Sequence, residues 1–308
     1  MNSVKQHVPE WFSAIAIKEE KKEFELIGPP SFFLDKNPEI HTGFEEFDLA
    51  EGALATYAKR DTYPIPLAED REGYCGDRHF DYWLTGLKDF FSIEKILNDQ
   101  GVSRDDICSV LDMGCASGRM LRHYDCQAGF KNIWGADINL KNVEWSRKFL
   151  SPTIKLLHNT ILPHLPVEDN YFDLVTAFSV FTHIDDLEMM WLAEIRRILK
   201  KGGYAYITLN TDNTWDNMDE KYPIYIDLIE QRDYIVEHSE KLVPGFNKNP
   251  MPSEKLVFTN TWGKVYNTNV FHHRNHIQEN WGRFFEIAGF YPNNHLIFQD
   301  VVLLKKTD

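Results

Sequence analysis

The sequence predicts an α/β fold whose sheet is doubly wound, mostly parallel and completed by an antiparallel C-terminal strand. Three observations support this prediction. Short apolar runs alternate with helical segments between residues 107 and 209. A turn rich in small residues follows the first of these runs, and a last apolar run, 299–306, follows a final helical segment. Strands that alternate with helices at this spacing favour parallel pairing with right-handed crossovers.

Each element can be assigned in order along the chain. Strands are expected over apolar runs bounded by turn residues, at 107–113, 132–137, 154–157, 172–178 and 204–209. Helices are expected at 86–97, from residue 119 after Gly118, at 141–150, at 186–199 and at 277–288, with Gly289 as the last stop. The helix at 186–199 carries apolar residues on one face and ends at Lys200, Lys201 and two glycines, a good stop signal.

Two further segments do not follow the alternation. Residues 1–80 are irregular and rich in aromatic residues, and we interpret them as an N-terminal extension or cap. Residues 81–308 would form the main domain, with an inserted cap segment at about 211–269 that contains a helix at 224–238 and a loop at 243–255. A connection this long between two strands usually has a function or is disordered.

Composition narrows the classes of function. Asp and Glu number 47 against 33 Lys and Arg, a formal net charge of −14 that would repel a phosphate backbone. The four cysteines form no Cys-x-x-Cys pair, so neither a zinc site nor a disulfide framework is indicated. No signal peptide and no apolar run of about 18 residues is visible. We therefore expect a soluble cytoplasmic protein without nucleic-acid or membrane partners, and leave its oligomeric state open.

The turn after the first strand carries the strongest chemical signal. The segment VLDMGCASGRML places Asp112, Gly114, Ala116 and Gly118 between this strand and the next helix. Small residues there let the backbone approach a ligand. In a dinucleotide-binding turn the third glycine would fall on Arg119, and an anionic Asp112 would repel a diphosphate. The turn therefore favours the cationic S-adenosylmethionine over NAD.

With this turn the sequence resembles the class I methyltransferases, which have a Rossmann-like sheet. Their first motif is matched at Asp112, Gly114 and Gly118, and Ala116 departs from its middle glycine. Asp137 stands where the family has an acidic residue after the second strand. The runs LPVEDNYFDLV, AFSVFTHI and EIRRILKKGGYAYITL also resemble the family. The resemblance covers roughly residues 74–306, and its ending is similar to bacterial small-molecule methyltransferases.

The resemblance implies the site for S-adenosylmethionine. Asp112 and the backbone of the glycine turn should hold the amino-acid end, and Asp137 should accept hydrogen bonds from the ribose hydroxyls. Asn159 should accept a hydrogen bond from the adenine amine, although a loop-capping role is also open. The full set of expected cofactor residues is Asp112, Gly114, Cys115, Ala116, Ser117, Gly118, Asp137, Ile138, Asn159 and Ser179.

The acceptor side is less defined. His183, just after the fourth strand, could be a general base or could order the loop, and Tyr82 is the second candidate for a catalytic role. The candidate substrate contacts are Tyr74, Arg78, Trp83 and Phe181, with ordinary packing of a cap as the alternative. No metal is expected, because the histidines at 272, 273 and 276 lack supporting carboxylates in the sequence.

The expected activity is transfer of a methyl group to a small molecule by in-line displacement. The acceptor could be the thioether of methionine or a related sulfur compound, since the methionine S-methyltransferases of bacterial dimethylsulfoniopropionate synthesis are similar in size and architecture. It could instead be an oxygen or nitrogen of a sugar or natural product, with His183 as base. A non-catalytic protein that binds S-adenosylmethionine is the third possibility.

Overall fold

The computed structural model of the chain describes residues 27–34, 52–220, 225, 228, 250–251, 254–259, 268–295 and 298–308. Most of the helix expected at 224–238 and of the loop expected at 243–255 lies outside these residues. No helix in the described ranges combines the length and the apolar character that crossing a membrane requires. The proposed division into a cap and a main domain at residue 80 stays a prediction.

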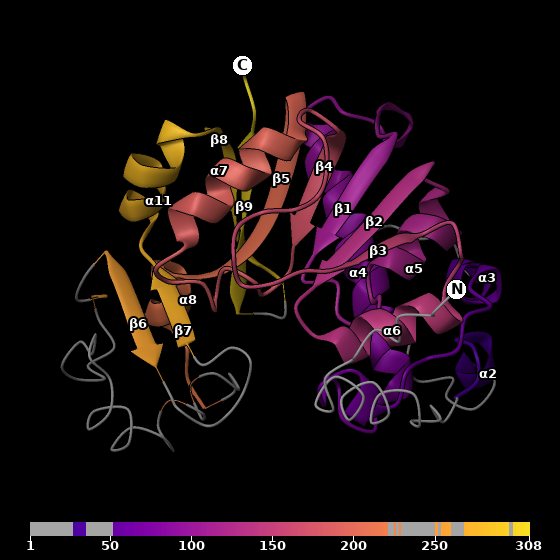
Figure 1. Cartoon of the computed structure of the whole chain (residues 1–308). Helices are drawn as coiled ribbons and strands as arrows, with labels where there is room; N and C mark the ends of the chain where they lie inside the picture. The colour runs from indigo at the N-terminus through magenta and orange to yellow at the C-terminus, as the bar shows by residue number, and fades with distance from the viewer. Residues whose placement is uncertain are drawn as a thin grey trace, which may run out of the picture.

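A mixed sheet forms the centre of the molecule (Figure 1). Its strand order is β3-β2-β1-β4-β5-β9-β8, in which β9 runs antiparallel to both β5 and β8 and the other neighbouring pairs are parallel. The bounds are β1 Ser109–Met113, β2 Asn132–Asp137, β3 Lys155–His158, β4 Phe172–Ala177, β5 Leu199–Thr211, β8 Glu286–His295 and β9 Gln299–Lys305. This arrangement confirms the predicted Rossmann-like fold class, including the antiparallel C-terminal strand.

The two faces of the sheet are covered by different helices (Figure 1). Tyr204 and Tyr206 of β5 face a core shared with α4 and α5, whereas Ala205 and Ile207 face a core shared with α7 and α11. This alternation follows from the two-residue period of a strand. The helices that cover or flank the sheet are α4 His79–Asp99, α5 Leu121–His123, α6 Leu140–Phe149, α7 Glu188–Ile198 and α11 Arg274–Asn280.

The structure differs from the sequence-based assignment in three places. The helix expected at 277–288 ends at Asn280, continues as a 3-10 turn Trp281–Arg283, and is followed by strand β8, in which Gly289 is an interior residue and not a stop. The reason is pairing with β9, which overrides the weak local pattern of a half-exposed edge strand. The helix after Gly118 is a single turn that continues as a π-helical turn, Tyr124–Ala128. The predicted irregular N-terminal segment contains helices α2 Ser31–Leu34 and α3 Ala53–Arg60.

A short hairpin joins the carboxyl end of β5. Its strands are β6 Lys255–Thr259 and β7 Thr268–His272, and β7 pairs with β5 in parallel. The buried carboxylate of Glu188 fixes this hairpin to α7, because it accepts hydrogen bonds from Lys255, His272 and His276. The indole N–H of Trp281 donates to the same carboxylate. Burial alone would raise the pKa of Glu188, but His272, His276 and Lys255 hold it well below its usual range.

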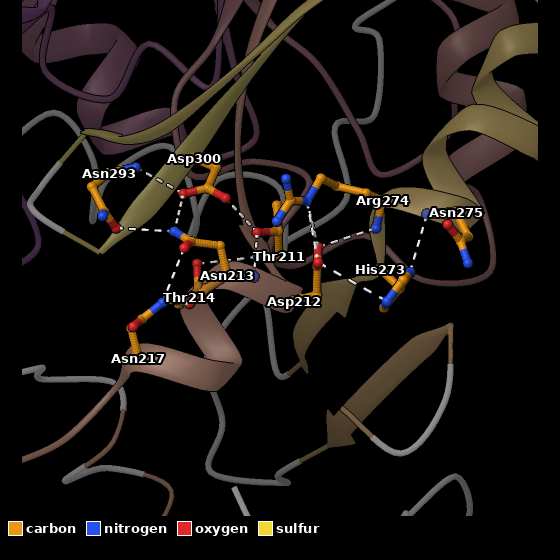
Figure 2. A network of polar contacts seen from close by, with 10 residues as sticks. All are labelled: Thr211, Asp212, Asn213, Thr214, Asn217, His273, Arg274, Asn275, Asn293 and Asp300. Carbon is orange, nitrogen blue, oxygen red and sulfur yellow. Dashed lines mark hydrogen bonds and ion pairs between the residues drawn. The ribbon is translucent and has the colours of Figure 1, made fainter. Parts of the chain in front are cut away.

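A polar network closes the end of β5 against the rest of the C-terminal region (Figure 2). Asp300 at the start of β9 accepts hydrogen bonds from the hydroxyl of Thr211 and, at 2.8 Å, from the backbone N–H of Asn293. Asp212, the first residue of the short helix α8 Asp212–Asn217, forms an ion pair of 3.1 Å with Arg274 of α11. The carboxyl end of β5, where an α/β ligand site is expected, is thus held by side chains from three separate segments.

Candidate active site

The glycine turn bends sharply at the carboxyl end of β1. Gly114, Ala116 and Gly118 all have φ in the left-handed region, at 72°, 44° and 77°. A Cβ at Gly114 would collide with the side chain of Val180, and one at Gly118 with Leu150. Both glycines are therefore required by geometry, whereas Ala116 accepts a conformation that favours glycine.

Asp137 joins this turn to the end of β2. Its Oδ2 accepts the backbone N–H of Ala116 at 2.7 Å, and its Oδ1 accepts the N–H of Asn139 at 2.7 Å. Burial raises the pKa of this carboxyl to about 6, although the two backbone N–H groups lower it. Each oxygen keeps a second lone pair, which suits a ligand with two adjacent hydroxyls.

Asp112 lies deeper than the sequence suggested. Its carboxylate is 3% exposed and accepts a hydrogen bond of 2.9 Å from the hydroxyl of Thr176 on β4. Burial raises its pKa to about 7. Burial therefore disfavours the negative charge that the sequence suggested for this carboxylate.

The adenine side of the expected site follows β2 and β3. Ile138 is half-buried at the end of β2. Asn159, just after β3, donates through Nδ2 to the carbonyl of Thr160, while its buried Oδ1 has no hydrogen-bond partner in the part of the chain that the structure describes. An orphaned amide oxygen is the group that an adenine amine would satisfy.

The segment around the short 3-10 helix Ala68–Asp70 packs directly against the glycine turn. The hydroxyl of Ser117 donates to the carbonyl of Asp70, and Glu72 accepts hydrogen bonds of 2.8 Å from both Asn139 and Asn142. Cys115 is 2% exposed and its thiol points into the core. The side chains of Ser117 and Cys115 therefore fix the turn, and their backbone alone remains for a ligand.

Two of the candidate substrate residues lie in the core. Trp83 is fully buried and its indole N–H donates to Asp61 at 2.9 Å, a carboxylate that also pairs with the buried Arg122. Phe181 is fully buried and its ring packs on Trp281, 5.3 Å between centroids. Packing therefore accounts for both side chains, and we do not carry either forward as a substrate contact.

The other candidate residues between positions 74 and 82 differ in their burial and in their distance from the glycine turn. Arg78 is 76% exposed and pairs with Asp81, so it points away from the turn. Tyr82 is buried, and its hydroxyl donates to the carbonyl of Ser117 at 3.3 Å. The ring of Tyr74 lies 6.2 Å from that of Tyr82. Tyr74 and Tyr82 thus border the glycine turn, whereas Arg78 does not.

The loop after β4 is held by both neighbouring strands. Ser179, with φ 55°, donates through its N–H to Thr208 at 2.7 Å and through its hydroxyl to Gln299 at 3.0 Å. His183 is half-buried, and its Nδ1 lies 2.6 Å from the carbonyl of Thr268 on β7. The hydroxyl of Thr268 donates back to the carbonyl of His183 at 2.7 Å.

The three histidines at 272, 273 and 276 have other partners. His272 and His276 bond to Glu188, and His273 caps α11 by accepting the N–H of Asn275 at 3.1 Å. In the part of the chain that the structure describes, no group of three His, Cys, Asp or Glu is placed to hold a metal ion.

One buried cluster beside the turn was missed by the sequence analysis. Arg119, which directly follows Gly118, pairs with Asp89 of α4 at 2.5 Å, and Asp89 also bonds to His295 at the end of β8. The position of Arg119 directly after the glycine turn could have identified it as a candidate from sequence. The contact between Asp89 and His295 could not be predicted, because these residues are 206 positions apart in the sequence.

Comparison with known proteins adds to this geometry. Residues 111–207, which run from β1 to β5, match the family model described as a methyltransferase domain. This match covers the region that the sequence predicted to be a class I methyltransferase domain with S-adenosylmethionine as its cofactor.

Curated relatives match part of the chain. A ubiquinone/menaquinone biosynthesis C-methyltransferase of Cupriavidus pinatubonensis is 33% identical over 127 residues, which are 38% of this chain and 48% of that protein. An uncharacterized protein of Methanocaldococcus jannaschii is 37% identical over 105 residues, 34% of this chain and 42% of its own. The chain thus spans about half the length of the curated relatives it matches.

Among solved structures, an S-adenosylmethionine-dependent methyltransferase from Clostridium acetobutylicum aligns with a TM-score of 0.47 and 14% identity over 70% of this chain and 92% of that one. One from Methanosarcina mazei aligns with a TM-score of 0.45 and 18% identity, over 68% of this chain and 96% of that one.

The residues present fit the cofactor. The orphaned oxygen of Asn159, the glycine positions that exclude a Cβ and the carboxylate of Asp137 lie along the carboxyl ends of β3, β1 and β2. The order of these strands in the sheet is the order in which adenine, ribose and amino-acid contacts are needed.

Proposed function

We propose that this chain transfers a methyl group from S-adenosylmethionine to a small-molecule acceptor. The observation that carries the proposal is the link between Asp137 and the glycine turn, in which one carboxylate organises the bare backbone at Ala116 and keeps lone pairs for a diol. The acidic composition and the absence of a basic cluster support a small molecule over nucleic acid as acceptor.

The chain would contribute mainly position and the exclusion of water. Asp137 would hold the ribose, Asn159 the adenine amine and the glycine turn the amino-acid end. When bound, the cofactor supplies an electrophilic methyl group on its sulfonium, so the acceptor must be aligned with that group. The contacts of Ser117, Asn139 and Asn142 with the segment 70–72 close one side of the turn, which would keep water from the reacting atoms.

The geometry of His183 favours an acceptor that loses a proton. Because a carbonyl accepts hydrogen bonds, the 2.6 Å contact with Thr268 assigns the ring proton to Nδ1. Nε2 is then the nitrogen with a lone pair, which is the form a general base needs. Methylation of oxygen or nitrogen with His183 as base is therefore our preferred reading of the acceptor side.

A thioether acceptor is the second candidate. Tyr74, Tyr82 and Phe178 place aromatic rings beside the glycine turn, with Arg119 in contact with two of them. Aromatic faces stabilise a sulfonium product, and no base is required for thioether chemistry.

Incubation of the enzyme with isotopically methyl-labelled S-adenosylmethionine and a metabolite extract tests both readings. Mass spectrometry should show a labelled small molecule. A protein that binds S-adenosylhomocysteine by calorimetry but labels nothing in any acceptor pool would support a non-catalytic role instead. Once an acceptor is known, His183→Ala should abolish turnover while cofactor affinity stays unchanged. Full activity of that variant would favour the thioether reading and remove His183 as base.

A further inference from the structure

Arg119 is a buried cation at the exit of the glycine turn. Its guanidinium lies 5.2 Å from the ring of Phe178, just after β4, and 5.5 Å from the ring of Tyr74. Its side chain retains 11% exposure, so it is not sealed from the carboxyl edge of the sheet. Arg119 therefore lies between Phe178, at the end of β4, and Tyr74, in the segment that precedes α4.

One buried carboxylate fixes the orientation of Arg119. Oδ2 of Asp89 accepts a hydrogen bond of 2.5 Å from Nη1 of Arg119. Oδ1 of Asp89 forms a second hydrogen bond, of 2.8 Å, with Nδ1 of His295. Burial alone would raise the pKa of Asp89, but His295 and Arg119 together hold it below its usual range. Asp89 therefore stays ionised and keeps the guanidinium in one position.

Arg119 has hydrogen-bond donors to spare. A guanidinium carries five N–H donors, and among the described residues the side chain of Arg119 makes its one hydrogen bond through Nη1. Its charge is shared with Asp89, yet the fork formed by its remaining N–H groups has the geometry that a second carboxylate accepts.

Tyr74 supplies a second, independent observation. Among the described residues its buried hydroxyl has no hydrogen-bond partner of normal geometry, although Thr85 lies close enough to lower its pKa, and an unsatisfied buried hydroxyl is costly. The neighbouring hydroxyl of Thr85 already donates to the carbonyl of Tyr82 at 3.1 Å. The guanidinium of Arg119 lies 5.5 Å from the centre of the Tyr74 ring, so the two side chains are direct neighbours.

We propose that Arg119 and Tyr74 bind the α-carboxylate at the amino-acid end of S-adenosylmethionine. This assignment rests on the proposed function. The amino-acid end of S-adenosylmethionine carries one ammonium and one carboxylate group. Asp112 and Arg119 supply the opposite charges for these two groups, and they interact electrostatically with each other. The ammonium group would face Asp112 and the carboxylate would face the guanidinium and the tyrosine hydroxyl.

Isothermal titration calorimetry with two ligands tests the assignment. S-adenosylhomocysteine carries the carboxylate, whereas 5′-methylthioadenosine lacks the whole amino-acid end. Arg119→Lys should weaken binding of S-adenosylhomocysteine about tenfold to a hundredfold, and Tyr74→Phe about threefold to tenfold. Both variants should bind 5′-methylthioadenosine as the wild type does, within about twofold, because the carboxylate is the group they have lost contact with.

Two controls separate this effect from general damage. Arg78→Met removes an exposed arginine from the same segment and should leave both affinities unchanged. Tyr74→Phe keeps the ring and deletes a hydroxyl for which the described residues offer no hydrogen bond of normal geometry, so it should fold normally. Unchanged affinity of Arg119→Lys and Tyr74→Phe for S-adenosylhomocysteine would overturn the assignment, and so would an equal loss for both ligands. A wild-type protein that binds neither ligand would overturn the proposed function itself.

Discussion

Asp112→Asn should stabilise the protein without ligand at neutral and alkaline pH. Asp112 has an ordinary pKa of 3.8 and a pKa of about 7 in the folded protein, where burial disfavours its charge. Between these values the folded chain holds a proton that the unfolded chain releases, so the free energy of unfolding falls as the pH rises through this window. Asparagine does not ionise, and its side-chain oxygen can still accept the hydrogen bond from Thr176.

The size of the effect follows from the change in pKa. The rise from 3.8 to about 7 corresponds to roughly 4 kcal/mol of ionisation free energy at pH 8, as an upper limit. The variant should therefore be more stable than the wild type by up to that amount at pH 8, and the two should converge near pH 4. Urea unfolding followed by tryptophan fluorescence at pH 4, 6 and 8 measures the difference.

Asp173→Asn is the matched control, since it makes the same chemical change at the other end of the sheet. Hydrogen bonds from Lys200 and Ser109 hold the pKa of Asp173 below its usual range, although burial alone would raise it. This variant should lose stability at pH 8. The argument for Asp112 is refuted if Asp112→Asn is less stable than the wild type at pH 8, or if its unfolding free energy keeps the wild-type dependence on pH.

Three further substitutions probe other parts of the structure. Asp137→Ala should weaken S-adenosylhomocysteine binding by about 1–3 kcal/mol in calorimetry, because charge-assisted hydrogen bonds are lost; equal affinity would exclude Asp137 as the ribose contact. Glu188→Gln should lower the free energy of unfolding by about 3 kcal/mol, since it removes the buried charge that Lys255, His272 and His276 share, while Asp185 still pairs with Lys255; a loss below about 0.5 kcal/mol in urea would show that the cluster does not hold the hairpin. Gly118→Ala should cost about 2–4 kcal/mol, because φ is 77° and the new methyl group meets Leu150; a thermal midpoint equal to that of the wild type would contradict this.

The parallel half of the sheet could be predicted from sequence because its strands are buried on both faces. β1, β2 and β4 are short apolar runs between turn signals, and their observed bounds lie within two residues of the expected ones. β8 could not be predicted in this way. It is an edge strand with a half-exposed pattern and an internal Pro292, so its identity comes from pairing with β9.

Sequence could predict the residues of the candidate site that lie in or near the glycine turn. It could not predict the contacts that depend on tertiary packing. The turn and Asp137 follow from spacing along the chain, and the structure brings them within 2.7 Å. Sequence could not show that Trp83 is buried and Arg78 exposed, because both lie in one aromatic segment. It also could not join Asp89 to His295, since that contact closes a loop of 206 positions.

The position of β9 has a consequence for how the chain reaches its native state. Val301, Val302, Leu303 and Leu304 have no exposed surface, and their strand fills the gap between β5 and β8. During synthesis residues 212–298 must therefore be added after β5 before β9, its second neighbour in the sheet, can pair with it. Until then its apolar edge is open to pairing with other chains, so folding should depend on chaperones or on low nascent-chain concentration. Substitutions that slow the arrival of this strand would be seen first as poor yield, with the folded fraction unchanged in stability.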